Sequence, residues 1–357
     1  MDGIVLLAKQ PGYTSFSSLH NVKKALNTTK VGHTGTLDSF AQGLLVVCTG
    51  RLTRLAGNIT EFDKEYKAVI AFGKETDTLE YTGEVIKEAG LPTEQALISA
   101  VKAFTGPQQQ VPPQFSALHV NGKRASDIAR KGGDVILPSR PIEVYKAEIN
   151  ELEKNSDGLV LNCMITFRVS KGTYIRSLAR DIAKACGSCG HLIGLYRTRV
   201  GDFRIEEAAG YSLLPAFTIE GCKKEVEKWQ SQAEAIESQK KNSKKAYKIS
   251  EADKQIQNEI PEKIKAFDEK TAVLCGFTPV HLTDEDVEAC FRNGKPILKK
   301  WFIEQIDKLE LDKSDDEVPG ANCRLLAVFS QTKDFCGIIE KKDQKHFSYR
   351  FVIAFSR

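Results

Sequence analysis

Residues 32–48 of this chain read GHTGTLDSFAQGLLVVC, a glycine-framed loop that holds one acidic residue and leads into an apolar run. Glycine permits positive φ and the close approach of another segment, and the apolar run at 44–48 is typical of a buried strand. The loop is therefore expected to be anchored beside a sheet, with the carboxylate of Asp38 held in a defined direction. Taken alone, the loop fits equally well an ordinary role of Asp38 as a cap of the next segment.

Length and composition favour a large and a smaller domain. The chain has 357 residues, of which 41% are hydrophobic, and its formal net charge of +4 is compatible with a nucleic-acid partner without identifying one. Its sequence has no apolar segment long enough to span a bilayer, and the N-terminus does not resemble a secretory signal. We expect a cytoplasmic protein that does not bind membranes.

The cysteines give no framework of regular spacings. There are nine, an odd number that suits a reducing compartment. Cys186 and Cys189 form one close pair, and with His191 they could supply half of a zinc site, but the sequence contains no second pair to complete a tetrahedral shell. We therefore expect no metal.

Alternating and helical patterns follow the central loop. Tyr66 begins a half-buried strand in which every second residue is apolar, and residues 97–104 carry the apolar stripe of a helix that should cover a sheet. A long alternating strand at 159–169 runs into a helix for which Thr173 is a candidate cap. The end of that strand and the start of that helix bring Tyr174 and Arg176 to one edge of the sheet.

Residues 107–140 differ in kind, because prolines stiffen an extended arm and Asn121-Gly122 predicts a hairpin turn. The arm then carries several basic residues and few acids. Such a segment could bind a phosphate backbone, or it could be a solvated surface helix, which the pattern alone favours.

The composition changes again at residues 223–270, which are rich in lysine and acids and poor in large apolar residues. We interpret this segment as an exposed helical hairpin or linker rather than a core element. Short apolar strands at 325–329, 337–339 and 351–355 then predict a small, mostly β domain over residues 271–357.

The chemistry expected at this sheet edge depends on one carboxylate. Asp38 beside the guanidinium of Arg176 would stay ionised and be available as a nucleophile. The sequence shows no second carboxylate in a comparable frame, no Ser-His-Asp set and no phosphate-binding glycine loop. These patterns argue against an ordinary hydrolase or kinase and leave a single-carboxylate covalent mechanism on a nucleic acid.

Five motifs in order resemble the TruB family of tRNA pseudouridine synthases over roughly residues 3–215. They are GHTGTLD at 32–38 with Gly43 and Gly50, KEY at 64–66, GxxTDT at 73–78, PQFSA at 113–117 and KGTYIR at 171–176. The resemblance implies an α+β fold with a mixed, largely antiparallel sheet flanked by helices. It implies a catalytic domain at 1–222 and, more loosely, a PUA-like RNA-binding domain at 271–357. The linker or insertion at 223–270 between them is longer and richer in lysine than the family pattern.

The activity implied is the isomerisation of uridine 55 in the T-loop of tRNA to pseudouridine, by base flipping and without a cofactor. By resemblance, Asp38 attacks or deprotonates the ribose, Arg176 pairs with Asp38, and Tyr66 stacks on the base and is a candidate for removing the C5 proton. The expected partner is the T-arm of tRNA, without an obligatory protein partner, and the enzyme is expected to act as a monomer.

Three further residues, His33, Tyr174 and Leu195, match positions that contact the flipped nucleotide or its neighbours, and the arm at 107–140 matches an insertion that grips the T-arm. Two other interpretations stay open. Tyr174 could be chiefly a packing residue, and His33 could stabilise the loop.

The chain departs from the family pattern beside the acid, where Ser39 follows Asp38 in place of the usual proline. That change is expected to loosen the loop without removing its chemistry. An alternative of another class is an RNA-binding or folding factor of the same fold whose catalysis has lapsed. A guide-RNA-dependent relative of dyskerin, which normally needs partner proteins, is a third interpretation.

Overall fold

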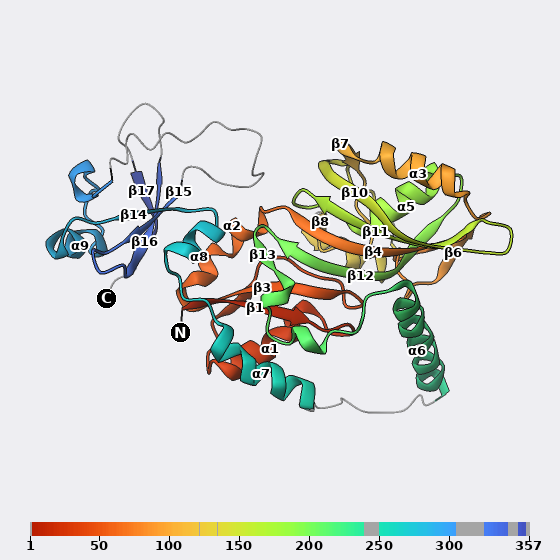
Figure 1. Cartoon of the computed structure of the whole chain (residues 1–357), viewed down its shortest axis with the longest axis horizontal. Helices are drawn as coiled ribbons and strands as arrows, with labels where there is room; N and C mark the ends of the chain where they lie inside the picture. Colours follow the sequence, from red (N-terminus) through yellow and green to blue (C-terminus); the bar gives the residue numbers. More distant parts are fainter. Residues whose placement is uncertain are drawn as a thin grey trace.

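The computed structural model describes residues 2–120, 122–133, 135–238, 250–304, 325–341 and 349–354. Figure 1 shows a large sheet with helices packed around it and a smaller, β-rich domain at one end. The α+β architecture expected from the sequence is confirmed. None of the helices in the described ranges is long and apolar enough to cross a membrane.

Within these ranges the central sheet has nine strands and is mixed, with a largely antiparallel order. Its main path is β1 (Gly3–Lys9), β3 (Gln42–Thr49), β12 (Gly190–Val200), β4 (Lys64–Phe72), β11 (Val160–Val169), β10 (Arg140–Lys154) and β7 (Gly106–Gln110). Two short strands, β2 (Val31–His33) and β13 (Phe203–Arg204), pair with β3 and β12. The pairing of β12 with β3 is parallel and spans only two residue pairs, so the two strands diverge beyond it.

Strands β1 and β3 are buried on both faces, which explains their continuous apolar sequence. One face packs against α1 (Ser15–Ala25) and α7 (Glu251–Lys263). The other packs against η1 (Gly50–Leu55), α2 (Ala56–Thr60) and the C-terminal domain. This double cover anchors the segment that precedes β3.

Helices α3 (Glu94–Ala103) and α5 (Ile175–Ala185) cover the other end of the sheet. Thr93 caps α3 by accepting a hydrogen bond from the N–H of Ala96. The predicted cap of α5 is wrong. Tyr174 occupies the N-cap position, while the Thr173 hydroxyl donates to the carbonyl oxygen of Ser170, because the chain turns there before the helix begins.

Short elements complete this part of the chain. They are β5 (Lys74–Thr76), β6 (Val85–Glu88), β8 (His119–Val120), β9 (Lys123–Arg124), α4 (Ala125–Ala129), η2 (Ile205–Glu207) and η3 (Tyr211–Leu213). The predicted hairpin in the arm is present as the β8–β9 pair.

The segment 223–270 is only partly as predicted. Figure 1 shows α6 (Ile219–Ser238) projecting from the sheet. The expectation that 223–270 contributes no core is wrong for α7 and the residues after it, because Ile256, Ile260 and Phe267 are buried. Two isoleucines four positions apart form one apolar stripe, and that stripe is enough to dock a helix whose other faces are charged.

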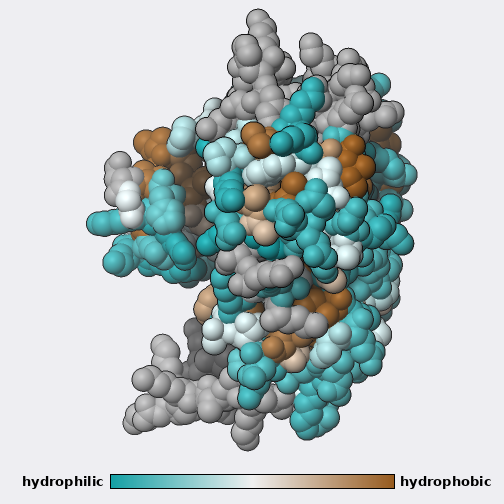
Figure 2. All heavy atoms as spheres, turned by 90° about the vertical axis from the view of Figure 1, so that its left-hand side faces the viewer, coloured by the Kyte–Doolittle hydropathy of each residue, from teal (hydrophilic) through white to brown (hydrophobic). Residues whose placement is uncertain are grey.

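The C-terminal domain contains a sheet in the order β14 (Thr278–His281), β15 (Leu325–Phe329), β16 (Phe335–Lys341) and β17 (Tyr349–Ala354). Its helical elements are α8 (Glu269–Leu274), α9 (Glu285–Arg292) and η4 (Lys299–Trp301). Residues of α8, β15 and β16 share one hydrophobic cluster with β1 and β3, so the two domains have a continuous core. Figure 2 views the molecule from this end, where hydrophilic residues predominate and hydrophobic ones form small separate patches.

Candidate active site

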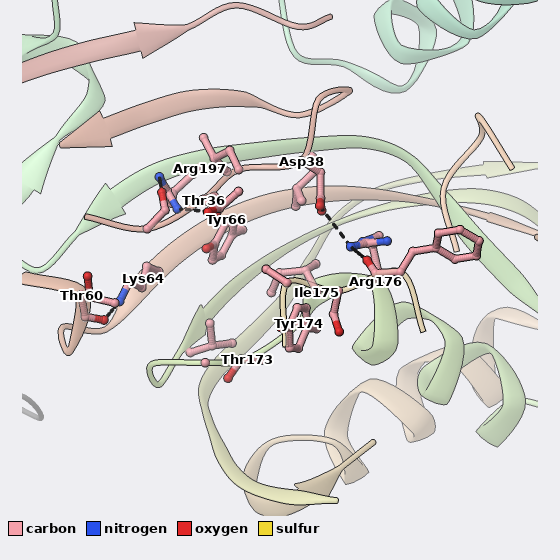
Figure 3. Close-up of a pocket in the computed structure, with 18 of the residues that line it drawn as sticks. Thr36, Asp38, Thr60, Lys64, Tyr66, Thr173, Tyr174, Ile175, Arg176 and Arg197 are labelled. Carbon is pink, nitrogen blue, oxygen red and sulfur yellow. Dashed lines mark hydrogen bonds and ion pairs between the residues drawn. The ribbon is translucent and has the colours of Figure 1, made fainter. Parts of the chain in front are cut away.

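A cleft of about 450 Å³ lies between the Asp38 loop (residues 34–41), the start of α5 and the arm at 107–140 (Figure 3). Five of the six side chains predicted for the site line it, namely Asp38, Tyr66, Tyr174, Arg176 and Leu195. They come from the loop, from β4, from the start of α5 and from β12. Sheet pairing and helix docking therefore bring together residues that are far apart in the chain.

The carboxylate of Asp38 and the guanidinium of Arg176 form an ion pair in this cleft. Nη2 of Arg176 lies 3.1 Å from Oδ1 of Asp38, and Figure 3 shows the two side chains pointing toward each other. The Arg176 side chain is only 5% exposed, whereas that of Asp38 is 33% exposed. The arginine also donates to the carbonyl oxygens of Thr78 and Phe115, each at 2.9 Å. Three separate segments thus hold one guanidinium in place beside an accessible carboxylate.

Tyr66 lines the same cleft from the beginning of strand β4. In the sheet it is the register partner of Phe167 on β11 and of Arg197 on β12. Its side chain is largely buried in the core cluster that also contains Leu195. The central position of β4 in the sheet therefore fixes the ring beside the Asp38 loop.

Tyr174 is held by two residues at the base of the arm. The Gln110 side-chain amide accepts from the backbone N–H of Tyr174 at 2.8 Å and donates to its carbonyl oxygen at 3.1 Å. The Arg140 guanidinium lies 4.8 Å from the centre of the tyrosine ring. The sequence analysis missed Gln110 and Arg140. Both stand where the proline-containing arm joins its flanking strands, which is the one signal that could have pointed to them.

His33 is not among the residues that line the cleft. Its Nδ1 accepts a hydrogen bond from the N–H of Gly35 at 3.4 Å, and burial followed by the charge of Arg197 lowers the pKa of its imidazole. This geometry fits the loop-stabilising interpretation of His33. Its contact with a nucleotide stays a prediction.

A buried arginine on β12 anchors the Asp38 loop. The Arg197 side chain donates from Nε to the carbonyl oxygen of Leu44 at 2.7 Å and from Nη2 to that of Gly35 at 3.2 Å. Gly43 has a φ of +119°, and a Cβ there would lie 2.3 Å from the carbonyl oxygen of Arg197. The glycine is therefore required both for its backbone conformation and for the close approach of β12.

The segment after Asp38 is fixed by donors from the N-terminal region. Nζ of the buried Lys9 donates to the carbonyl oxygens of Ala41 at 2.6 Å and Ser39 at 3.1 Å. The backbone N–H of Gly12 donates to the same carbonyl oxygen of Ser39 at 2.8 Å. The expected loosening at Ser39 is thus opposed by three hydrogen bonds to the loop backbone.

A second carboxylate stands near Asp38, contrary to the sequence analysis. Burial, and after it the negative charge of Asp38, raise the pKa of Glu80 to about 7 against the opposing charge of Arg176. Glu80 reaches this place because the turn between β5 and β6 folds back and forms a bridge to Leu192 on β12. Burial likewise lowers the pKa of Lys9 to about 7, against the attraction of Asp38. Glu80 and Lys9 do not line the cleft themselves, but both are buried and each interacts electrostatically with Asp38.

The possible zinc ligands are engaged with the backbone. The Cys186 thiol donates to the carbonyl oxygen of Ile182 at 3.0 Å, and Nδ1 of His191 bonds to that of Lys74 at 2.9 Å. Among the residues that the structure describes, no three His, Cys, Asp or Glu side chains are grouped to share a metal ion.

Comparison with known proteins identifies relatives of one family. Residues 23–175 match the family model described as TruB family pseudouridylate synthase (N terminal domain). A tRNA pseudouridine synthase B from Treponema denticola is 42% identical over 323 residues, which cover 86% of this chain and 87% of the relative. The enzyme of that name from Treponema pallidum is 42% identical over 235 residues, 61% of this chain and 64% of the relative. The one from Borreliella burgdorferi is 41% identical over 208 residues, which cover 58% of this chain and 72% of the relative.

Two solved structures share the fold. A chain from an H/ACA RNP bound to a substrate RNA containing 2'-deoxyuridine has a TM-score of 0.58 at 21% identity, covering 99% of this chain and 85% of its own. A chain from a Cbf5-Nop10-Gar1 complex has a TM-score of 0.58 at 22% identity, covering 99% and 84%. The likeness extends over both domains.

Proposed function

Because this chain belongs to the TruB family of pseudouridine synthases, which are isomerases, we propose that it converts uridine 55 in the T-loop of tRNA to pseudouridine. The enzymes that it resembles at 41–42% identity carry tRNA in their names. The finer proposal, that position 55 is the target, rests on the five motifs and on the site.

The observation that carries the proposal is the ion pair between Asp38 and Arg176 at 3.1 Å in an open cleft. The reaction breaks the bond between N1 of the base and C1′ of the ribose, rotates the base and forms a bond from C5 to C1′. Asp38 either attacks the ribose or removes a proton from it, and a fixed guanidinium keeps the carboxylate ionised for either role. The C5 proton must then leave, and Tyr66 is the candidate to take it.

Base flipping would bring the uridine to Asp38. A base inside a structured loop must be extruded at a cost of a few kcal/mol, which phosphate contacts and stacking have to offset. The cleft volume of about 450 Å³ lies within the range of small-ligand sites. Tyr66, Tyr174 and Leu195 supply apolar surface for the base there, while His33 is proposed to contact a neighbouring nucleotide.

The arm is proposed to hold the T-arm. Arg124, Arg130 and Arg140 line the cleft from the arm and its base, where their charges can pair with phosphates. The catalytic domain would then be residues 1–222, with the β-rich domain at 271–357 serving as a PUA-like second RNA contact. Neither a cofactor nor a protein partner enters this mechanism, and the proposed active form is a monomer.

A lapsed RNA-binding factor is less well supported by this site. Such a protein would have no need to keep a buried arginine bonded to an accessible carboxylate and to two carbonyl oxygens.

Release of tritium from a T-arm stem-loop labelled at C5 of uridine tests the proposal. Purified wild-type protein alone should release label from position 55, and Asp38→Ala should release none. Asp157→Ala, at an exposed turn, is the matched control and should retain full activity. A stem-loop with cytidine at position 55 should also release no label. A well-folded wild type that releases no label would refute the proposal, and a need for a guide RNA would favour the dyskerin-like reading.

A further inference from the structure

A row of three aromatic rings joins the Asp38 loop to helix α6. The rings of Phe40 and Tyr81 lie 5.7 Å apart at an interplanar angle of 88°, and those of Tyr81 and Trp229 lie 5.8 Å apart at 78°. Both contacts are edge-to-face, the arrangement that aromatic pairs favour. Phe40 is two residues from Asp38, and Tyr81 follows Glu80. One end of the row, Phe40, therefore belongs to the loop of Asp38, and the other end, Trp229, belongs to α6.

Tyr81 is the fixed middle of this row. Its backbone N–H donates to the carbonyl oxygen of Leu192 at 3.0 Å, which ties it to β12 in the central sheet. Its ring packs against Phe40 on the side of the loop and against α6 on the other side. A displacement of the Tyr81 ring would consequently change the packing of Phe40.

The space beside the row is not filled by protein. Phe40, Tyr81 and Leu195 also line a cavity of about 390 Å³, which α6 and the turn before it close from the other side. Because a ring beside open space lacks packing on that side, its position depends more strongly on the neighbours that remain. Leu195 also lines the active-site cleft, so this cavity lies directly behind the reactive loop.

Helix α6 does not depend on Trp229 for its attachment. Ile219 and Cys222 are buried against Val69 and Ile193 of the sheet, and Lys223 forms an ion pair of 2.6 Å with Glu153 on β10. Val226 packs against the same cluster. Trp229, half-buried, is thus available to support Tyr81 without being the anchor of the helix.

We propose that Trp229 is a positioning residue that holds the Asp38 loop in its reactive geometry through Tyr81 and Phe40. The inference rests on the proposed isomerisation. It also explains how the loop tolerates Ser39 in place of the usual proline, since packing of the adjacent Phe40 would supply the stiffness that a proline would otherwise give. Displacements of about 1 Å at a reacting group can cost about a hundredfold in rate, so a small shift of the loop should be measurable.

Single-turnover tritium release at saturating stem-loop is the test. Trp229→Ala should slow release by about three- to tenfold, as expected for coupling through packed side chains, while the Kd for the stem-loop stays within about twofold. Trp229→Phe keeps a ring edge on Tyr81 and should restore most of the rate. Trp229→Leu keeps apolar volume but no ring and should be slow like Trp229→Ala.

Two comparisons separate positioning from a general loosening of α6. Lys223→Ala removes the ion pair with Glu153 that attaches the same helix to β10, away from the row, and it should release tritium at nearly the wild-type rate. In a Tyr81→Leu background, Trp229→Ala should slow the reaction no further, because the route to Phe40 is already broken.

Full activity of Trp229→Ala, equal slowing by Lys223→Ala, or multiplying effects in the double variant would each overturn the inference. These outcomes all require an active wild type. An inactive wild type instead contradicts the proposed function, so the two failures are distinguishable.

Discussion

Gln110 and Arg140 are register partners on β7 and β10, and both side chains contact Tyr174. The arm leaves the sheet at this pair of residues. The amide of Gln110 engages the backbone of Tyr174 twice, and the guanidinium of Arg140 lies against its ring. The base of the arm and the start of α5 are thereby locked together two residues before Arg176.

Gln110→Ala should destabilise the fold, because it leaves the N–H and carbonyl of Tyr174 without these partners. We expect a loss of about 1–3 kcal/mol in the free energy of unfolding, measured by urea denaturation. Gln109→Ala on the same strand is exposed and should change stability by less than about 0.5 kcal/mol. Equal effects of the two changes would show that the Gln110 amide contributes nothing specific.

Arg176→Lys should nearly abolish catalysis while leaving the protein folded. An ammonium group keeps the charge but cannot reach Asp38 and the carbonyl oxygens of Thr78 and Phe115 together. We expect single-turnover tritium release to fall by about a hundredfold, on the scale of a lost charge-assisted hydrogen bond of about 3 kcal/mol. Arg180→Lys, on the same helix, is the control and should remain active. A lysine variant with wild-type activity would contradict the role proposed for the guanidinium.

Glu80 should make stability depend on pH below neutrality. Its pKa is raised from 4.5 to about 7 in the folded protein, so between these values the folded state holds a proton that the unfolded state has released. Stability contributed by protonated Glu80 is therefore present at pH 4.5 and lost as the pH rises toward 7. Glu80→Gln should flatten the free energy of unfolding over that interval. The same slope in wild type and variant would rule out the shift.

The pH interval for that experiment matters because of Lys9. Its pKa is lowered from 10.5 to about 7, so the unfolded state binds the extra proton only above pH 7. That group makes stability rise with pH between 7 and 10.5, the opposite sign to Glu80. Denaturation curves at pH 5.0, 6.0 and 7.0 therefore avoid Lys9, and the difference between wild type and Glu80→Gln separates the carboxyl group from His33, His191 and His281, whose pKa values are also shifted.

Gly43→Ala should be strongly destabilising, since an alanine must adopt a φ of +119° and place Cβ 2.3 Å from the carbonyl oxygen of Arg197. The cost of such backbone strain alone is about 1–3 kcal/mol, before any displacement of β12. Gly57→Ala is the matched control, because its Cβ would meet no atom within 4 Å and it lies within α2. Thermal unfolding should show a lower Tm for the first variant and an unchanged or higher Tm for the second.

Arg130→Ala should weaken binding of the T-arm without slowing the bound reaction. The side chain lines the cleft from the arm, and its ion pair with Asp127 is exposed, so removal should not unfold the arm. If it contacts one phosphate, the slope of log K against log salt should become shallower by about 0.7–0.9. Lys228→Ala, on the exposed face of α6, should leave both affinity and slope unchanged. An unaltered salt dependence for Arg130→Ala would place the RNA elsewhere.

Much of the fold followed from local patterns. The alternation that begins at Tyr66 and the long strand before Ser170 predicted β4 and β11, because a period of two is visible within a few residues. Segment 223–270 was partly misjudged for the converse reason. Only two isoleucines of α7 face β1, and the charged and amide side chains on its other faces concealed that stripe.

The site residues likewise fall into those that motifs predicted and those that only long-range contacts place. The motifs identified Asp38, Tyr66 and Arg176, and the structure brings all three to one cleft. Glu80 near Asp38 was missed, because its placement requires the turn between β5 and β6 to fold onto β12. The same applies to Gln110, whose partner Tyr174 is 64 residues away in the chain.

The sequence alone predicted most strands and helices and the order of the motifs, since these depend on residue type and short spacing. The family resemblance that the motifs carry indicated the three side chains expected to react. Tertiary structure decided which groups hold those side chains. Asp38 and Arg176 are 138 residues apart, and Arg197 lies 153 residues from the carbonyl oxygen that it binds on β3. Contacts of this kind exist only once the strands have paired in the order β3, β12, β4, because that order carries the loop, the tyrosine and the buried arginine to the same edge of the sheet.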